Sequence, residues 1–225
     1  MARAVLFGSI GTLVETSELQ RTAYNAAFAE AGLSWFWDTK AYRQMLKSAG
    51  GQSRLTDYAA TRNDKVNVPA LHLRKTELFM DLVSRTPLAL RPGVSDVLES
   101  ARRNGVKTAL VTTTSKANVT TVLMAGGLSV DAFDTVIDQS HVEHPKPAPD
   151  AYERALLDLH LVPADAMAIE DNPDGVSGAV AAGLECIAFP GAMHDHSDFI
   201  NAPIITDTLS PEMLLQSPQW IQAAE

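Results

Sequence analysis

Short apolar runs alternate with segments of helical periodicity along most of this chain, and no other feature constrains its fold as strongly. The runs are continuously apolar, which is typical of strands that are buried on both faces of a parallel sheet. Strands that alternate with helices predict a doubly wound α/β sheet. The predicted strands are Ala4–Phe7, Lys107–Thr112, Thr135–Ile137, Ala166–Ile169 and Cys186–Phe189.

Residues 17–85 interrupt this alternation with helical patterns alone, and Gly50 and Gly51 break the stretch. We therefore expect a small all-helical insertion after the first strand, and a core made of residues 1–16 and 86–225. The aromatic run Trp35 to Trp37 is expected to pack between the inserted helices. The helical patterns are clearest over Ser17–Ala31, Thr39–Lys47 and Leu71–Val83.

Composition excludes several classes of protein. The chain has 225 residues and a net charge of −9, with no cluster of basic residues, so nucleic acid is not an expected partner. No apolar run reaches the ~18 residues that a membrane helix needs. Cys186 is the single cysteine, which rules out an internal disulfide and fits a reducing compartment. We expect a cytoplasmic protein that does not bind membranes.

Polar residues follow each predicted strand. The carboxyl ends of parallel strands meet at one edge of the sheet, where ligands bind. Hydroxyl groups and backbone N–H groups of Thr112 and Thr113 suit phosphate oxygens, and Lys146 is a point charge suited to phosphate. Glu170 and Asp171 offer the oxygen ligands that Mg²⁺ prefers. Each feature alone also fits a helix cap or an exposed charge, but their succession predicts an anion site.

Seven segments carry a resemblance that covers nearly the whole chain. They are AVLFGSIGTLVET, ELQRTAYNAAFAEAGL, GGQSR, RPGV, ALVTTTSKANV, HPKPAPDAY and AIEDNPDGVSGAVAAGL. The chain resembles the haloacid dehalogenase superfamily, in the branch with a helical cap that includes β-phosphoglucomutase-like and CbbY-like sugar-phosphate phosphatases. The resemblance implies a Rossmann-type core, a helical cap over residues 17–85, Mg²⁺ as cofactor and a phosphorylated sugar as ligand.

The first motif departs from that family. Its pattern is F-D-x-D-G-T-L, whereas this chain reads FGSIGTL from Phe7 to Leu13. In the family the first aspartate attacks phosphorus and the second moves the proton. Gly8 and Ile10 stand at these positions and can do neither. The resemblance therefore implies an impaired or inactive enzyme. Gly8 also removes a metal ligand, so Mg²⁺ binding is expected to be weak or absent.

The rest of the family's site is present. The resemblance implies catalytic positions at Thr112 and Lys146, beside the lost aspartates at Gly8 and Ile10. It further implies that the chain still binds phosphate or a sugar phosphate. The implied substrate-binding residues are Thr113, Gly51, Ser53 and Arg54, and the implied metal ligands are Glu170 and Asp171.

Two alternatives stay open. The first is an active Mg²⁺-dependent phosphatase with a relocated nucleophile, and the second is a stable fold that keeps no site. Ser9 is adjacent to the missing aspartates, but side-chain alternation predicts that it points away from them. A dehalogenase would need the same missing nucleophile. Four histidines are candidates for a transition-metal site, but no ligand spacing supports zinc, so they are expected to be surface residues. They are His141, His144, His194 and His196.

Overall fold

The computed structural model describes residues 2–46, 50–200 and 202–214. The chain divides into two compact units. One unit combines Met1–Glu15 with Leu88–Glu225, and the other is Thr16–Pro87. The sequence placed the inserted unit at residues 17–85, and its role as a cap stays a prediction.

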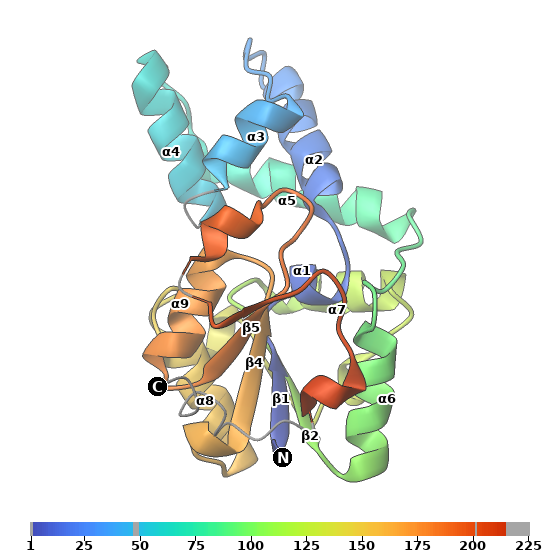
Figure 1. The fold of residues 1–225 in the computed structure, drawn as a ribbon. Coiled ribbons are helices and arrows are strands. Elements are labelled where there is room, and N and C mark those ends of the chain that lie inside the picture. The colour runs from blue at the N-terminus through green and yellow to red at the C-terminus, as the bar shows by residue number, and fades with distance from the viewer. Residues whose placement is uncertain (1, 47–49, 201, 215–225) are drawn as a thin grey trace. The chain divides into compact units, whose positions relative to one another are not determined.

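The first unit, called the core unit here, is built on a parallel sheet. Within the described residues the sheet has six strands in the order β3-β2-β1-β4-β5-β6 (Figure 1). The predicted doubly wound sheet is thus confirmed. The last strand has only two residues, too few for a sequence pattern, and was missed. The strands are β1 (Ala4–Phe7), β2 (Lys107–Val111), β3 (Thr135–Ile137), β4 (Ala166–Glu170), β5 (Glu185–Ala188) and β6 (Ile204–Ile205).

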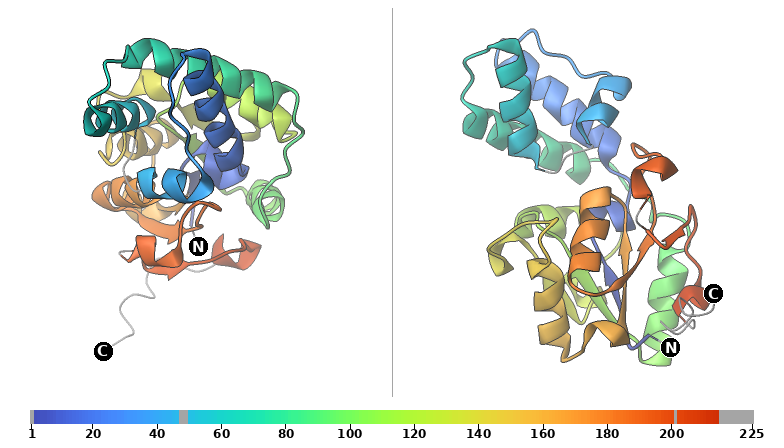
Figure 2. Two further views of the ribbon diagram at one scale, coloured as in Figure 1. Left: turned by 90° about the horizontal axis from the view of Figure 1, so that it is seen from above. Right: turned by 60° about the vertical axis from the view of Figure 1, so that its left-hand side comes forward.

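Helices cover both faces of this sheet. Helices α8 and α9 pack side by side on one face (Figures 1 and 2). Helices α8 and α9 connect strands in the direction from β3 toward β5, whereas α6 and α7 connect strands in the opposite direction, from β1 toward β3. Right-handed crossovers therefore place α6 and α7 on the opposite face. The helices are α1 (Ile10–Leu13), α6 (Val94–Asn104), α7 (Lys116–Ala125), α8 (Asp150–Leu159) and α9 (Pro173–Ala181). The 3₁₀ turns are η1 (Val130–Ala132), η2 (Gln139–His141), η3 (Pro163–Asp165), η4 (His196–Phe199) and η5 (Pro211–Leu214).

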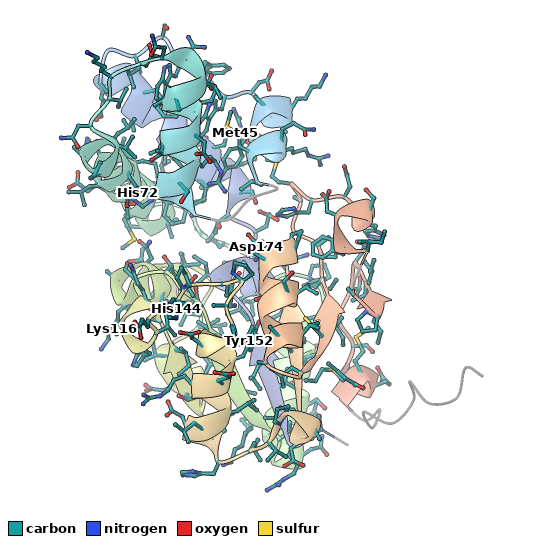
Figure 3. The ribbon with its side chains drawn as sticks, turned by 90° about the vertical axis from the view of Figure 1, so that its left-hand side faces the viewer. Met45, His72, Lys116, His144, Tyr152 and Asp174 are labelled. Atoms are coloured by element: carbon teal, nitrogen blue, oxygen red, sulfur yellow. The ribbon has the colours of Figure 1, made fainter. Side chains whose placement is uncertain are left out.

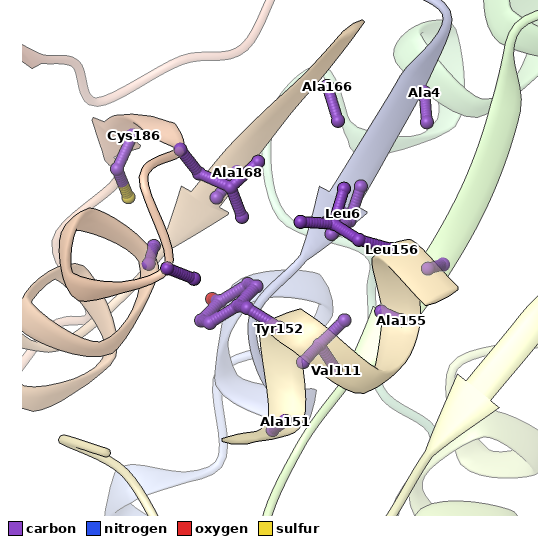
Figure 4. Packing of buried hydrophobic residues seen from close by; sticks show 14 of the residues in the cluster. Ala4, Leu6, Val111, Ala151, Tyr152, Ala155, Leu156, Ala166, Ala168 and Cys186 are labelled. Carbon is purple, nitrogen blue, oxygen red and sulfur yellow. The ribbon is translucent and has the colours of Figure 1, made fainter. Parts of the chain in front are cut away.

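Helix α8 shows how sequence periodicity positions the core. The apolar residues predicted to share one side of this helix are all buried, whereas Leu157, outside that set, is exposed. Figure 4 shows Tyr152, Ala155 and Leu156 of this helix packed toward Leu6 of β1 and Val111 of β2. Alanines on the strands leave room for these larger side chains. This packing brings the Tyr152 ring, in the first turn of α8, next to the carboxyl ends of the central strands.

Arg91 links three segments at that edge of the sheet. Its guanidinium lies 3.5 Å from the centroid of the Phe189 ring. It also donates hydrogen bonds to the carbonyl oxygens of Gly11, Phe189 and Pro190. Burial lowers the pKa of Arg91, although nearby carboxylates oppose the shift. A planar group with several donors is suited to such a junction.

The second unit, called the helical unit here, has an aromatic core. Trp35 and Trp37 are buried, as expected, but Phe36 is 68% exposed, which corrects the expectation for that residue. Trp37 lies between Tyr24 and Phe28, with ring centroids at 4.8 and 4.7 Å. The helices are α2 (Ser17–Glu30), α3 (Thr39–Met45), α4 (Gly51–Arg62) and α5 (Val68–Ser84). Lys47, the predicted end of α3, lies outside the described residues.

Candidate functional site

A buried ion pair lies at the carboxyl end of β4. Glu170 is fully buried, and its Oε1 accepts a hydrogen bond of 2.6 Å from Lys146 Nζ. The Tyr152 hydroxyl donates to the same oxygen at 2.6 Å. Lys146 also donates to the backbone carbonyls of Gly8 and Val111. With the Tyr152 hydroxyl oxygen at 3.4 Å, the ammonium has acceptors at the carboxyl ends of β1, β2 and β4 and on α8.

Burial governs the electrostatics of this ion pair. Burial raises the pKa of Glu170, the Lys146 ammonium lowers it, and the net direction is upward. The pKa of Tyr152 is well above its ordinary value, because burial and the adjacent Glu170 carboxylate both disfavour a phenolate. Tyr152 therefore acts as a hydrogen-bond donor, and Figure 3 shows it on α8 of the core unit.

Two glycines make room for the Glu170 side chain. A Cβ atom built on Gly8, at the end of β1, would overlap the Glu170 carboxyl group. A Cβ atom on Gly175, in α9, would overlap the same group. The absence of side chains at these positions therefore allows Glu170 to point into the sheet edge, toward Lys146.

Asp171, the next residue, is held by hydroxyl groups. Its Oδ1 accepts hydrogen bonds from Ser9 Oγ at 2.5 Å and from Thr12 Oγ1 at 3.0 Å. Ser9 Oγ also accepts from the Gly11 N–H at the start of α1. Alternation predicts that Ser9 points away from the side-chain positions of residues 8 and 10, and this direction stays a prediction. The Ser9 hydroxyl does contact Asp171, one of the predicted site residues.

The other predicted core residues lie close to these groups in the fold. Thr112 is buried at the end of β2, and its hydroxyl oxygen accepts from the Thr114 N–H at 3.2 Å. Thr113 is half-buried in the same turn. Ile10 is buried as the first residue of α1. The roles of Thr112, Thr113 and Lys146 stay predictions.

The predicted residues of the helical unit lie in the first turn of α4, where Ser53 is exposed and Arg54 is partly buried. Arg54 Nε donates to the Met45 carbonyl at 2.8 Å. A Cβ on Gly51 would lie 2.6 Å from His72 Nε2 and 2.7 Å from the Tyr24 hydroxyl. Both atoms are the ends of side chains, so a larger residue at position 51 would require them to shift. The substrate-binding role of Gly51 stays a prediction.

Sequence reasoning missed two basic residues near Arg54, both on α5. Lys75 is 7% exposed, donates to Gln20 Oε1 and lies 4.5 Å from the Tyr24 ring centroid. Burial and, to a smaller extent, the nearby Arg54 charge lower its pKa to about 7. The second is His72, which is labelled in Figure 3. Burial, Lys75 and Arg54 lower its pKa. No carboxylate contributes to the pKa shifts of Lys75 and His72. We call Arg54, His72 and Lys75 the basic cluster.

Stability is expected to rise with pH because of Lys75. Its pKa is about 7 in the folded chain, against an ordinary value of 10.5. Between these values the unfolded chain binds a proton that the folded chain lacks. The unfolding free energy should therefore rise by up to ~1.4 kcal/mol per pH unit. Urea unfolding followed from pH 7 to 9.5 measures this slope.

Lys75→Met should flatten the slope, whereas Lys65→Met, which replaces an exposed lysine of the helical unit, should leave it unchanged. An equal slope in all three proteins would contradict the assignment to Lys75.

The fold and the site together define a class of protein. A doubly wound sheet with hydroxyl, lysine and carboxylate side chains at its strand ends is an α/β protein with a strand-end site for a polar ligand. The model of the haloacid dehalogenase-like hydrolases matches residues 2–183. The chain belongs to this family, and the predicted membership is confirmed.

Its relatives lie in the CbbY-like branch. The chain is 38% identical to Protein CbbY of Cereibacter sphaeroides, over 93% of this chain and 94% of that protein. It is 27% identical to a phosphorylated carbohydrates phosphatase of Thermotoga maritima, over 87% of each. A crystal structure of a CbbY mutant from Rhodobacter sphaeroides, in complex with xylulose-(1,5)bisphosphate, is 38% identical with a TM-score of 0.84. The match covers 92% of this chain and 95% of the chain in that crystal structure.

The family generally uses Mg²⁺, and the residues here do not fit that ion as they are arranged. The Glu170 oxygens accept hydrogen bonds from protein donors, and the Lys146 ammonium is 2.6 Å from one of them. Asp171 is bound by two hydroxyls. Within the described residues, no three His, Cys, Asp or Glu side chains are grouped to hold a metal. In the same residues, no helix is both long and apolar enough to span a membrane.

Proposed function

We propose that this chain binds phosphate or a phosphorylated sugar and turns it over poorly or not at all. The observation that carries the proposal is the end of β1, where Gly8 and Ile10 provide neither a nucleophile nor a proton carrier. Loss of such residues typically lowers kcat by ~10⁴–10⁶. The lost carboxylates would also have repelled a bound phosphate.

Two features support retained binding. Relatives at 38% and 37% identity have been crystallised with xylulose-(1,5)bisphosphate and with phosphate. In this chain the basic cluster groups three nitrogen-bearing side chains, and a bound phosphate would favour the protonated forms of Lys75 and His72, whose pKa values are lowered in the free protein. The Arg54 guanidinium has the planar donor arrangement that binds phosphate oxygens in pairs. We therefore place one phosphate-binding position at the basic cluster.

The test combines a binding and a turnover measurement on the full chain. We expect calorimetry to detect xylulose 1,5-bisphosphate, and phosphate release with Mg²⁺ to stay at the level of the protein-free blank. Arg54→Ala should weaken binding about tenfold or more, because a charge-assisted hydrogen bond is worth ~1.5–3 kcal/mol. Arg62→Ala, in the last turn of the same helix, is the matched control.

Two results would contradict the proposal. Absence of binding at millimolar bisphosphate would exclude retained binding. Phosphate release at ordinary enzymatic rates would exclude an inactive protein and favour an active phosphatase with a different nucleophile.

The second candidate is an active phosphatase that uses Ser9, and the Ser9–Asp171 hydrogen bond favours it. Ser9 Oγ would attack phosphorus while its proton passes to Asp171. The bond from phosphorus to the ester oxygen would break, and the leaving oxygen would take that proton. Water would then release phosphate from the serine. Mass spectrometry of the protein after incubation with substrate would detect the phosphoserine, and Ser9→Ala should abolish both it and phosphate release.

A further inference from the structure

We propose that Glu170 is a permanent internal counter-ion of Lys146, that it occupies the space a side chain at position 8 would need, and that the strand-end site consequently takes no divalent cation. The inference concerns the folded chain without ligand. It therefore stands or falls independently of the proposed function.

The first step is steric. The Glu170 carboxyl group lies between the backbones of Gly8 and Gly175, and a Cβ on either would overlap it. A carboxylate at position 8 and the present position of Glu170 therefore exclude each other. The space opened by glycine at position 8 is not a vacant pocket, because a side chain from β4 fills it.

The second step is charge balance. Lys146 and Glu170 are 9% and 0% exposed, and their charged atoms are 2.6 Å apart. One buried ammonium thus faces one buried carboxylate, with the Tyr152 hydroxyl as a neutral donor. A second carboxylate at position 8 would leave a net negative charge in a site shielded from water, which is strongly unfavourable.

The third step concerns the oxygens that a cation would need. Glu170 Oε1 accepts from Lys146 and Tyr152. Its Oε2 accepts from the Asp171 N–H at 3.2 Å and from Asn172 Nδ2 at 3.4 Å. Both oxygens already have protein donors, and one of these donors is an ammonium that repels a cation. The hydrogen bonds that fix Glu170 therefore also keep a divalent ion out.

A double-mutant cycle tests the steric and charge steps. Gly8→Asp and Glu170→Ala should each lower the melting temperature by ~5–10 °C, the first by overlap and the second by leaving Lys146 unpaired. In the double variant an aspartate at position 8 can form the ion pair with Lys146. The fall in melting temperature of the double variant should therefore be clearly smaller than the sum of the falls in the two single variants. Losses that add would overturn the proposal.

The matched control pairs Gly8→Asp with Glu153→Ala, which removes an exposed carboxylate of α8 and should give additive changes. If Gly8→Asp does not fold, Gly8→Ala and Glu170→Ala provide a milder cycle that tests the overlap alone. Recovery of folding when Glu170→Ala is added to Gly8→Asp would support the proposal by itself, and failure of both cycles to show coupling would overturn it.

Melting temperature in Mg²⁺ tests the third step without an activity assay. A cation that binds the folded chain must stabilise it. We expect the same melting temperature in 10 mM MgCl₂, in EDTA, and in NaCl of matched ionic strength. A rise of several degrees in Mg²⁺ alone that disappears in Asp171→Asn would show a cation at this site and overturn the inference.

Discussion

Replacement of Lys146 by methionine is expected to lower the unfolding free energy by about 3–5 kcal/mol, because it leaves a buried carboxylate without its partner. The Glu170 carboxylate is fully buried and receives its only charged hydrogen bond among the described residues from Lys146. Methionine keeps most of the lysine volume, so the charge is the main change. Urea unfolding at pH 7, followed by circular dichroism, measures the loss.

The matched control is Lys116→Met, which removes an exposed lysine of the same unit and should change stability by less than about 0.5 kcal/mol. The deficit of Lys146→Met should grow as the pH rises above the ordinary range of a carboxyl group. Burial already raises the pKa of Glu170, and without Lys146 the neutral acid is the tolerated form. A small loss at every pH would mean that the ion pair does not stabilise the core unit.

Replacement of Trp37 by alanine should destabilise the helical unit by about 3–5 kcal/mol. The ring is fully buried, and it contacts Tyr24 and Phe28 from α2. The Asn25 side chain also binds the Trp37 backbone as donor and as acceptor, which holds the segment before α3 in place. Amide hydrogen exchange in α2 and α5 isolates this unit from the core unit and is the appropriate measurement.

Two neighbouring variants sharpen this test. Phe36→Ala removes an aromatic ring that is 68% exposed, and it should have little effect. Trp37→Phe keeps the aromatic contacts and removes a buried indole N–H that has no acceptor among the described residues, so its loss should be much smaller. Equal losses in Phe36→Ala and Trp37→Ala would contradict the assignment of the aromatic core.

The fold could be read from the sequence because its signals are local. Continuous apolar runs marked β1, β2 and β4 to within one residue, and helical periodicity marked the buried side of α8. Right-handed crossovers then fixed which residues meet at the strand ends. Strand β6 was missed because a strand of two residues is too short to show a hydrophobic pattern in the sequence.

The site could be read only in part. The absence of carboxylates at Gly8 and Ile10 is a property of the sequence. The hydrogen bond from the Ser9 hydroxyl to Asp171 was not predicted, because it depends on helix α1 beginning right after Ser9 and on a residue far away in the sequence. Lys75 was missed because, by spacing alone, a lysine in an amphipathic helix is indistinguishable from a solvated one.

By itself, the sequence determined the order of strands and helices, the family, and the loss of two carboxylates at the end of β1. Tertiary structure decided what replaced them. Glu170 turns toward Lys146 because Gly8 and Gly175, which are far apart in the sequence, both lack a Cβ at that point. The basic cluster likewise brings α4 and α5 together around buried aromatic rings. Such arrangements depend on side-chain packing between distant segments, which no local pattern encodes.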